Sequence, residues 1–145
     1  MILEGILLFV IVVLTVLIGK ELLAKPPPPK LVKPPEQKQR VSLALYELKN
    51  YAGQNEDTPI YVSIEGKIYD VTRGRAFYGP NGPYGAFAGN EITCALARSS
   101  TDAKDVNIPW NSLTPVEKST LADWKNFFAT KYDEIGTLSD PPTAK

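Results

Sequence analysis

The chain has 145 residues, enough for one domain with a terminal extension, and its 16 basic and 16 acidic residues give a formal net charge of zero. It has one cysteine and no histidine, which excludes an intramolecular disulfide, a Ser-His-Asp triad and any His-ligated metal. From Val41 onward, 10 basic and 13 acidic residues give a charge of −3, so no basic nucleic-acid footprint is present and no nucleic-acid partner is expected.

The first predicted element is a transmembrane anchor over residues 1–24. The stretch from Ile2 to Ile18 is apolar except for Glu4, Gly5 and Thr15. Because about 17–20 apolar residues span a bilayer, this stretch predicts one membrane-spanning helix, which residues 22–24 could extend. A cleaved signal peptide is the alternative, and the lack of a basic residue before the apolar run argues against it.

A Pro/Lys-rich linker is predicted over residues 25–40. Its prolines favour an extended polyproline segment, about 3.1 Å per residue, that would hold a domain off the membrane surface. A solvated linker or a ligand for an SH3-like partner is an alternative interpretation. Positive residues after an apolar run mark the cytosolic side, so the sequence predicts a single-pass protein with its domain facing the cytosol.

The domain is predicted to cover residues 41–140, with a tail over 141–145. Leu45, Leu48 and Tyr51 recur at helical spacing, and Gly53 follows as a C-cap. Residues 60–64 and 67–71 are short runs of high β-propensity separated by a Glu-Gly pair. That pattern predicts a β-hairpin.

The next segment, residues 72–85, is here called the aromatic segment. It is too rich in glycine and proline for a strand or a helix, and too aromatic for a solvated linker. A loop that keeps Phe77, Tyr78, Tyr84 and Phe87 close together is expected to line a ligand site.

Two helices are predicted to follow. The first begins after Asn90, where apolar residues share one face. The second begins at Thr114, because a Thr N-cap, a proline at the first helical position and a glutamate three residues after the cap form a strong start signal. Leu121, Trp124 and Phe128 share one face of that helix, and Gly136 is expected just past its end. The order predicts an α+β domain with a small sheet.

Three stretches resemble a known family. Residues 64–74, Ile-Glu-Gly-Lys-Ile-Tyr-Asp-Val-Thr-Arg-Gly, look like the GKVYDVT core of cytochrome b5-like domains. Residues 77–89 closely resemble the FYGPxGPYxxFAG signature of the membrane-associated progesterone receptor family. The ending of that family is matched by Trp124, Phe128, Lys131, Tyr132 and Gly136. The resemblance covers about residues 43–138 and implies a cytochrome b5-like fold with flanking helices.

The resemblance also implies a haem b site. Without histidine, the family's iron ligand is a tyrosinate, which places Tyr84 as the axial ligand and Tyr78 as its hydrogen-bonding neighbour. Lys131 and Tyr132 would contact the haem from the C-terminal helix. Ferric iron and a nearby ammonium both favour a phenolate over a neutral phenol. One haem face would stay open, which allows a haem-mediated homodimer.

Several residues of this expected site have simpler interpretations. Tyr78 and Tyr84 could be core aromatics, and Lys131 a solvated helix residue. The sequence departs from the family after Gly89, where many relatives carry His, Asp and Arg and this chain reads Asn-Glu-Ile-Thr-Cys-Ala. The departure leaves the hydrogen bonding near the haem open. It also brings Cys94 near the site, as a buried small hydrophobe or as an alternative thiolate ligand.

The function implied by the resemblance is regulation or support of sterol-synthesis haem-thiolate monooxygenases, the cytochrome P-450 class, in the endoplasmic reticulum membrane. A cytochrome b5-type electron carrier is a second hypothesis, against which the absent histidines argue, because tyrosinate ligation lowers the potential. A steroid- or lipid-binding module is the third. No nucleophile–base pair is visible, so an enzyme is not expected.

Overall fold

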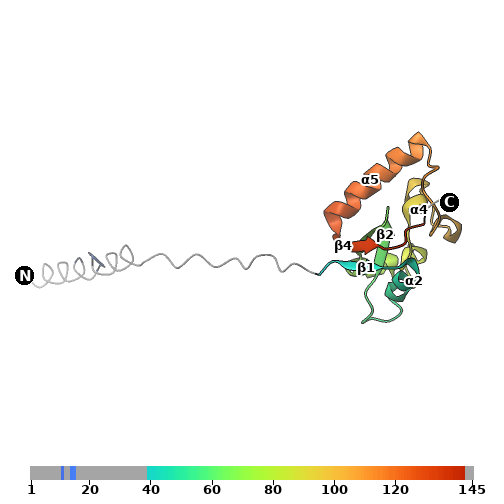
Figure 1. The fold of residues 1–145 in the computed structure, drawn as a ribbon. Helices are drawn as coiled ribbons and strands as arrows, with labels where there is room; N and C mark the ends of the chain where they lie inside the picture. Colours follow the sequence, from blue (N-terminus) through green and yellow to red (C-terminus); the bar gives the residue numbers. More distant parts are fainter. Residues whose placement is uncertain (1–10, 12–13, 16–38, 143–145) are drawn as a thin grey trace, which may run out of the picture. The chain divides into compact units, whose positions relative to one another are not determined.

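The structure is a computed structural model that describes residues 11, 14–15 and 39–142 (Figure 1). The chain divides into two compact units, residues 1–36 and 37–145, and the second unit is the domain. Most of the predicted anchor, of the predicted linker and of the tail lies outside the described residues. Within the described ranges, no helix is long and apolar enough to cross a bilayer.

A four-stranded mixed sheet organises the domain. Its strands, in the spatial order β1-β4-β3-β2, are β1 (Val41–Leu43), β4 (Asp133–Leu138), β3 (Lys67–Asp70) and β2 (Tyr61–Ile64). Strands β2 and β3 form the predicted hairpin. Its two turn residues, Glu65 and Gly66, have φ angles of 48° and 77°, as a type I′ turn requires.

The two remaining strands were not predicted. β1 pairs in parallel with β4, and β4 pairs antiparallel with β3. Gly136 lies past the end of the last helix, as expected, but inside β4 and opposite Val41, so it belongs to a strand that the sequence pattern did not predict. This pairing joins the two ends of the domain, and a short local pattern carries little information about such a distant partner.

The two faces of the sheet are covered by different elements because side chains alternate along each strand. On one face, Ile68 packs with Leu48 and Leu138 beneath α2 (Leu45–Leu48) and the 3₁₀ turn η1 (Lys49–Tyr51). On the other, Tyr69 belongs to the larger core beneath α4 (Thr93–Ala97) and α5 (Pro115–Lys131). Figure 1 shows α2 and α5 on opposite sides of the sheet.

The long helix α5 begins where the sequence predicted. The Thr114 hydroxyl accepts a hydrogen bond from the Glu117 amide at 3.2 Å, and the Glu117 carboxylate accepts one from the Thr114 amide at 2.7 Å. This capping box satisfies amide groups that a helix start leaves unpaired. Leu121 and Phe128 are buried in the core, with Trp124 partly buried beside them.

The prediction that the aromatic segment contains no regular structure is wrong in part. Residues 75–78 form the short helix α3 (Arg75–Tyr78), between the 3₁₀ turns η2 (Thr72–Gly74) and η3 (Gly85–Phe87). Glycines flank α3 on both sides instead of interrupting it, so they act as its boundaries. The Arg75 guanidinium fixes this helix by donating hydrogen bonds to four carbonyl oxygens of residues 53–58.

Glu91 is a buried carboxylate that joins the hairpin to α4. It is 1% exposed and accepts hydrogen bonds from the Ser63 hydroxyl at 2.6 Å, the Gly66 amide at 3.2 Å and the Thr93 amide at 2.8 Å. The Thr93 hydroxyl also donates to it. Burial nevertheless holds the pKa of Glu91 above its usual value, against the opposing effect of these bonds.

We expect Glu91→Gln to lower the free energy of unfolding by about 1–3 kcal/mol, because an amide group would replace an acceptor oxygen and face buried donors. A carboxyl whose pKa is raised in the folded state stabilises it fully below the unfolded pKa and loses that contribution as the pH rises through the folded pKa. The stability difference between wild type and Glu91→Gln should therefore be largest in acid. Denaturant unfolding across pH measures it.

The exposed Glu56 offers a matched control, since Glu56→Gln makes the same chemical change at the surface. It should alter stability by less than about 0.5 kcal/mol at every pH. Equal stability of wild type and Glu91→Gln would contradict a structural role for the buried carboxylate.

Candidate functional site

A cleft of about 210 Å³ lies between the end of the aromatic segment, α4 and α5. Its walls are four rings, those of Tyr78, Tyr84, Phe87 and Trp124, and α4 contributes Ala95 and Leu96. Ligand sites usually have about 300–1,000 Å³ and mostly apolar walls with a few polar groups. This cleft has such walls but is smaller, so a flat ligand could enter it with one edge left in solvent.

The rim of the cleft is polar and uncharged. It is formed by Ser99, Ser100 and Thr101, which follow α4. Sequence reasoning missed these residues, because a short polar stretch after a helix has no local signal that separates it from an ordinary loop.

The backbone that carries Tyr84 is folded back tightly onto α3. The Tyr84 amide donates to the Phe77 carbonyl oxygen at 2.8 Å, and the Gly82 amide to that of Gly79 at 2.9 Å. A Cβ atom on Gly82 would collide with the Phe77 carbonyl group. Glycine is therefore required at this position of the signature for steric reasons. Because Gly82 has no side chain, the backbone can turn closely enough to place Tyr84 next to Tyr78.

Three tyrosine rings meet at the inner end of the cleft. The Tyr78 ring centroid lies 5.9 Å from that of Tyr84 and 6.1 Å from that of Tyr132, and the Tyr84 ring stacks on Phe87 at 5.7 Å. A Cβ atom on Gly74 would lie 2.6 Å from the Tyr132 hydroxyl, so a second close glycine makes room for this group.

The environment distinguishes two of these phenols. Tyr78 is 6% exposed, and burial, the neighbouring Tyr132 and Tyr84 and a hydrogen bond with Tyr132 raise the pKa of Tyr78 far above 10. Tyr78 therefore stays protonated at neutral pH and can donate a hydrogen bond. Tyr84 is partly exposed along the wall of the cleft and is the better placed of the two to meet a bound metal centre.

Lys131 lies beside this cluster and not in the cleft. Its ammonium nitrogen is 5.2 Å from the Phe127 ring centroid and 5.6 Å from those of Phe77 and Tyr132, distances typical of cation–π contacts. Lys131 follows Trp124 by seven residues on α5, which puts both on one face about 10 Å apart. The structure thus brings together Tyr78, Tyr84 and Tyr132, with Lys131 at the edge.

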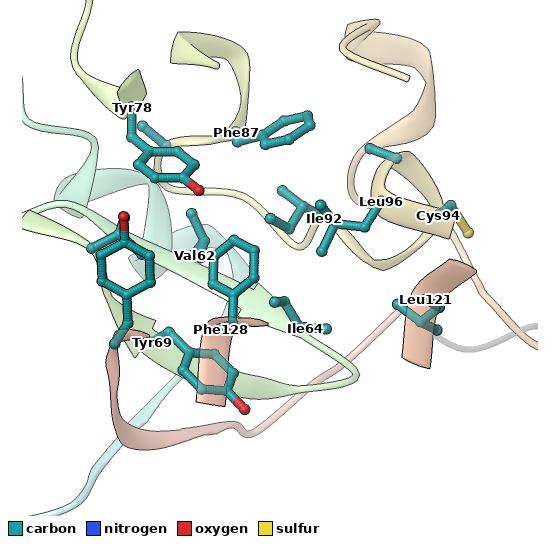
Figure 2. Packing of buried hydrophobic residues seen from close by; sticks show 14 of the residues in the cluster. Val62, Ile64, Tyr69, Tyr78, Phe87, Ile92, Cys94, Leu96, Leu121 and Phe128 are labelled. Carbon is teal, nitrogen blue, oxygen red and sulfur yellow. The ribbon is translucent and has the colours of Figure 1, made fainter. Parts of the chain in front are cut away.

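Cys94 is buried and turned away from the cleft. Its thiol lies 3.3 Å from the Pro109 carbonyl oxygen, which accepts its hydrogen bond, and burial is the main cause that raises the pKa of Cys94. Figure 2 shows the sulfur pointing away from Tyr78 and Phe87. The prediction of a buried small hydrophobe is confirmed. In the described part of the chain, no cluster of three or more His, Cys, Asp or Glu could hold a metal ion.

Residues 45–133 match the family model for the cytochrome b5-like haem/steroid-binding domain, and the chain belongs to that family. Membrane steroid-binding protein 1 of Arabidopsis thaliana is 43% identical over 102 residues, covering 68% of this chain and 46% of that protein. Membrane-associated progesterone receptor component 2 of Homo sapiens is 36% identical over 110 residues, covering 74% and 48%. The family predicted from the motifs is confirmed.

Two further likenesses bear on fold and role. Cytochrome P450 regulator dap1 of Schizosaccharomyces pombe is 38% identical over 107 residues, covering 68% of this chain and 63% of that protein. A solved Arabidopsis thaliana structure described as having a cytochrome b5-like fold is 37% identical, with a TM-score of 0.65 over 70% of this chain and 94% of that one. The α+β fold is confirmed. The chain spans less than half the length of the first curated relatives it matches.

We expect Gly82→Ala to displace Tyr84, because the new methyl group would collide with the Phe77 carbonyl oxygen. The variant should lose about 1–3 kcal/mol of stability, and amide hydrogen exchange should quicken locally at residues 77–87. Asn81→Ala, at an exposed neighbouring position, is the control and should leave both unchanged. If the amide hydrogen-exchange rates of Gly82→Ala equal those of the wild type, the loop tolerates a side chain at this position.

Proposed function

We propose that this chain is a membrane-anchored haem-binding protein that regulates haem-thiolate monooxygenases of the cytochrome P-450 class. The observation that carries the proposal is the placement of Tyr84 on the wall of an aromatic cleft beside the buried, protonated Tyr78. The family supplies the haem, since its domain is described as haem- or steroid-binding.

In this proposal the cleft would hold haem b, and the Tyr84 oxygen would bind its iron. Tyr78 has one O–H, which in the structure bonds Tyr132. With haem bound, this O–H would turn to the ligand oxygen, and the Tyr132 hydroxyl would donate to the Tyr78 oxygen from behind. Lys131 contacts the haem edge from α5. Bound haem would supply ferric iron, whose positive charge favours the phenolate form of Tyr84. The fit is favourable because the cleft walls are aromatic, although part of the macrocycle must stay in solvent.

A haem left open on one face could also stack against that of a second copy, which gives the proposed homodimer. The exposed Phe127 and Phe77 rings beside Lys131 extend the apolar surface near the cleft. Two copies facing each other there would cover both rings.

The proposed partners follow from a relative and from charge. The yeast relative is named a cytochrome P450 regulator. The domain from Val41 onward carries −3, which suits a basic face on a monooxygenase, because complementary charge accelerates and orients association. An anchor at residues 1–24, in the endoplasmic reticulum membrane with the domain in the cytosol, would confine both proteins to one surface. The membrane names of the relatives support the membrane association in this proposal.

Two other roles are weaker. A cytochrome b5-type electron carrier requires a reduction potential suited to its electron donor and acceptor. A hard phenolate ligand stabilises ferric iron and therefore lowers the reduction potential of the haem. A steroid-binding role is favoured by one observation, the uncharged rim and aromatic walls of the same cleft. A catalytic role has no support, since relatives are named as binding proteins or a regulator.

Haem titration of variants tests the ligand assignment. Outer hydrogen-bond partners of a metal ligand are worth about 10–100-fold in affinity, so Tyr78→Phe should weaken haem binding within that range. Tyr84→Phe removes the ligand oxygen itself and should weaken binding by more than about 100-fold. Wild type should show a ferric high-spin spectrum with a phenolate-to-iron charge-transfer band that Tyr84→Phe lacks.

Cys94→Ala is the matched control, because it removes the one thiol while leaving both phenols in place. Its haem spectrum and affinity should equal those of wild type. If Tyr84→Phe kept full haem binding and Cys94→Ala lost it, the iron ligand would be the Cys94 thiolate, and the assignment of Tyr84 as the ligand would be wrong.

Partner binding should depend on ionic strength. Screening acts over about 8 Å at physiological salt, so raising salt should weaken recovery of microsomal monooxygenases with the full chain. Replacing exposed acidic residues, for example Asp123→Asn, should weaken recovery at low salt without changing the haem spectrum. Failure to recover any such enzyme at low salt would remove the partner proposal.

A further inference from the structure

The turn that leads into Tyr84 contains an Asn-Gly pair, Asn81 and Gly82, and every other asparagine of the chain is followed by a residue with a side chain. In an Asn-Gly pair the glycine nitrogen can attack the carboxamide carbon, because no Cβ atom of the second residue hinders the approach. Asn81 is exposed, and within the described domain its carboxamide takes part in no hydrogen bond. The carboxamide is therefore free to rotate toward the Gly82 nitrogen.

The folded turn restrains the attacking nitrogen. Pro80 and Asn81 are the central residues of a β-turn in which the Gly82 amide donates to the Gly79 carbonyl oxygen at 2.9 Å. The attack requires this N–H to lose its proton. The hydrogen bond opposes that loss, because the bare nitrogen would face a carbonyl oxygen with no proton between them. The reaction therefore needs the turn to open first.

The chemistry of the opened turn needs no co-reactant other than water. The Gly82 nitrogen forms a bond to Cγ of Asn81, and the side-chain nitrogen leaves as ammonia together with the proton lost from Gly82. Water then opens the resulting five-membered succinimide ring at one of its two carbonyl carbons. Opening at the side-chain carbonyl leaves aspartate. Opening at the main-chain carbonyl leaves isoaspartate, in which the main chain runs through the former side chain.

The two products differ in how they fit the turn. Isoaspartate adds a carbon atom to the main chain next to Gly82, where even a Cβ atom would collide with the Phe77 carbonyl oxygen. The same carbonyl oxygen accepts a hydrogen bond from the Tyr84 amide at 2.8 Å, so a longer turn displaces Tyr84. Aspartate changes the charge and leaves the main chain as it was, at the position that the family signature leaves variable.

We propose that Asn81 and Gly82 form a site of spontaneous modification, where isoaspartate arises at a rate set by opening of the turn and then displaces Tyr84 from the cleft wall. The turn thereby limits the working life of the ligand site. The loss of haem binding rests on the proposed function, whereas the reaction and its dependence on turn opening do not.

The rate is tested on the haem-free full chain in lipid nanodiscs, incubated at neutral and mildly alkaline pH beside a peptide of residues 77–87. Mass-spectrometric peptide mapping measures deamidation, and an isoaspartyl methyltransferase labels the isoaspartate. Amide hydrogen exchange of Gly82 reports how often the same N–H is released. Deamidation of Asn81 should be slower in the folded chain than in the peptide by the protection factor of the Gly82 amide, within about threefold.

Asn81→Gln is the matched control for the reaction. It keeps a carboxamide but would have to form a larger ring, so it should stop isoaspartate formation at this position without changing the exchange of Gly82. Deamidation of Asn81 in the folded chain at the rate of the peptide would overturn the proposal. So would the absence of isoaspartate from both samples.

The effect on the site is tested by separating the isoaspartate form of the aged chain by chromatography. Asn81→Asp has the same charge and composition with a normal main chain, and it should bind haem like wild type. The isoaspartate form should bind haem at least about tenfold more weakly and exchange amide hydrogen faster at residues 77–87. Equal exchange in the isoaspartate form and Asn81→Asp would overturn the displacement of Tyr84. If wild type bound no haem, the proposed function would fail, and this exchange comparison would still decide the inference.

Discussion

The position of Phe128 is the constraint on which the domain depends. Its ring is fully buried on the inner face of α5 and lies 6.0 Å from Tyr69 of the sheet, 6.3 Å from Tyr78 and 5.6 Å from Tyr132. One side chain therefore connects the long helix, the sheet and the phenol cluster (Figure 2). Replacing such a buried phenylalanine by alanine lowers the free energy of unfolding by about 3–5 kcal/mol, a large part of the stability of a small domain. The same side chain therefore supports both the fold and the phenol cluster of the site.

The site is built by two opposite uses of backbone conformation. At Gly82 the absence of a side chain lets the chain approach the Phe77 carbonyl oxygen, which places Tyr84 beside Tyr78. At Ser99 a side chain is kept where glycine would be easier. The first choice follows from packing alone. The second places a hydroxyl group at the rim of the cleft.

The chemistry of the cleft follows from how its polar groups are buried. Burial raises the pKa of Tyr78 further above that of a free phenol, so Tyr78 remains a hydrogen-bond donor, while Tyr84 is partly exposed on the cleft wall. Glu91 does not enter the cleft but accepts hydrogen bonds from the hairpin inside the core. The buried carboxylate therefore ties the hairpin to the start of α4.

Local patterns in the sequence determined the hairpin, the start of α5 at Thr114 and the meeting of aromatic residues, because turn geometry and helix capping depend on near neighbours. The motifs also determined the family. Only the tertiary structure decided the pairing of β1 with β4, the burial of Cys94 away from the cleft and the contribution of Ser99 to its rim. Each of these depends on contacts between distant segments, whose free energy is set by packing and not by local conformational preference.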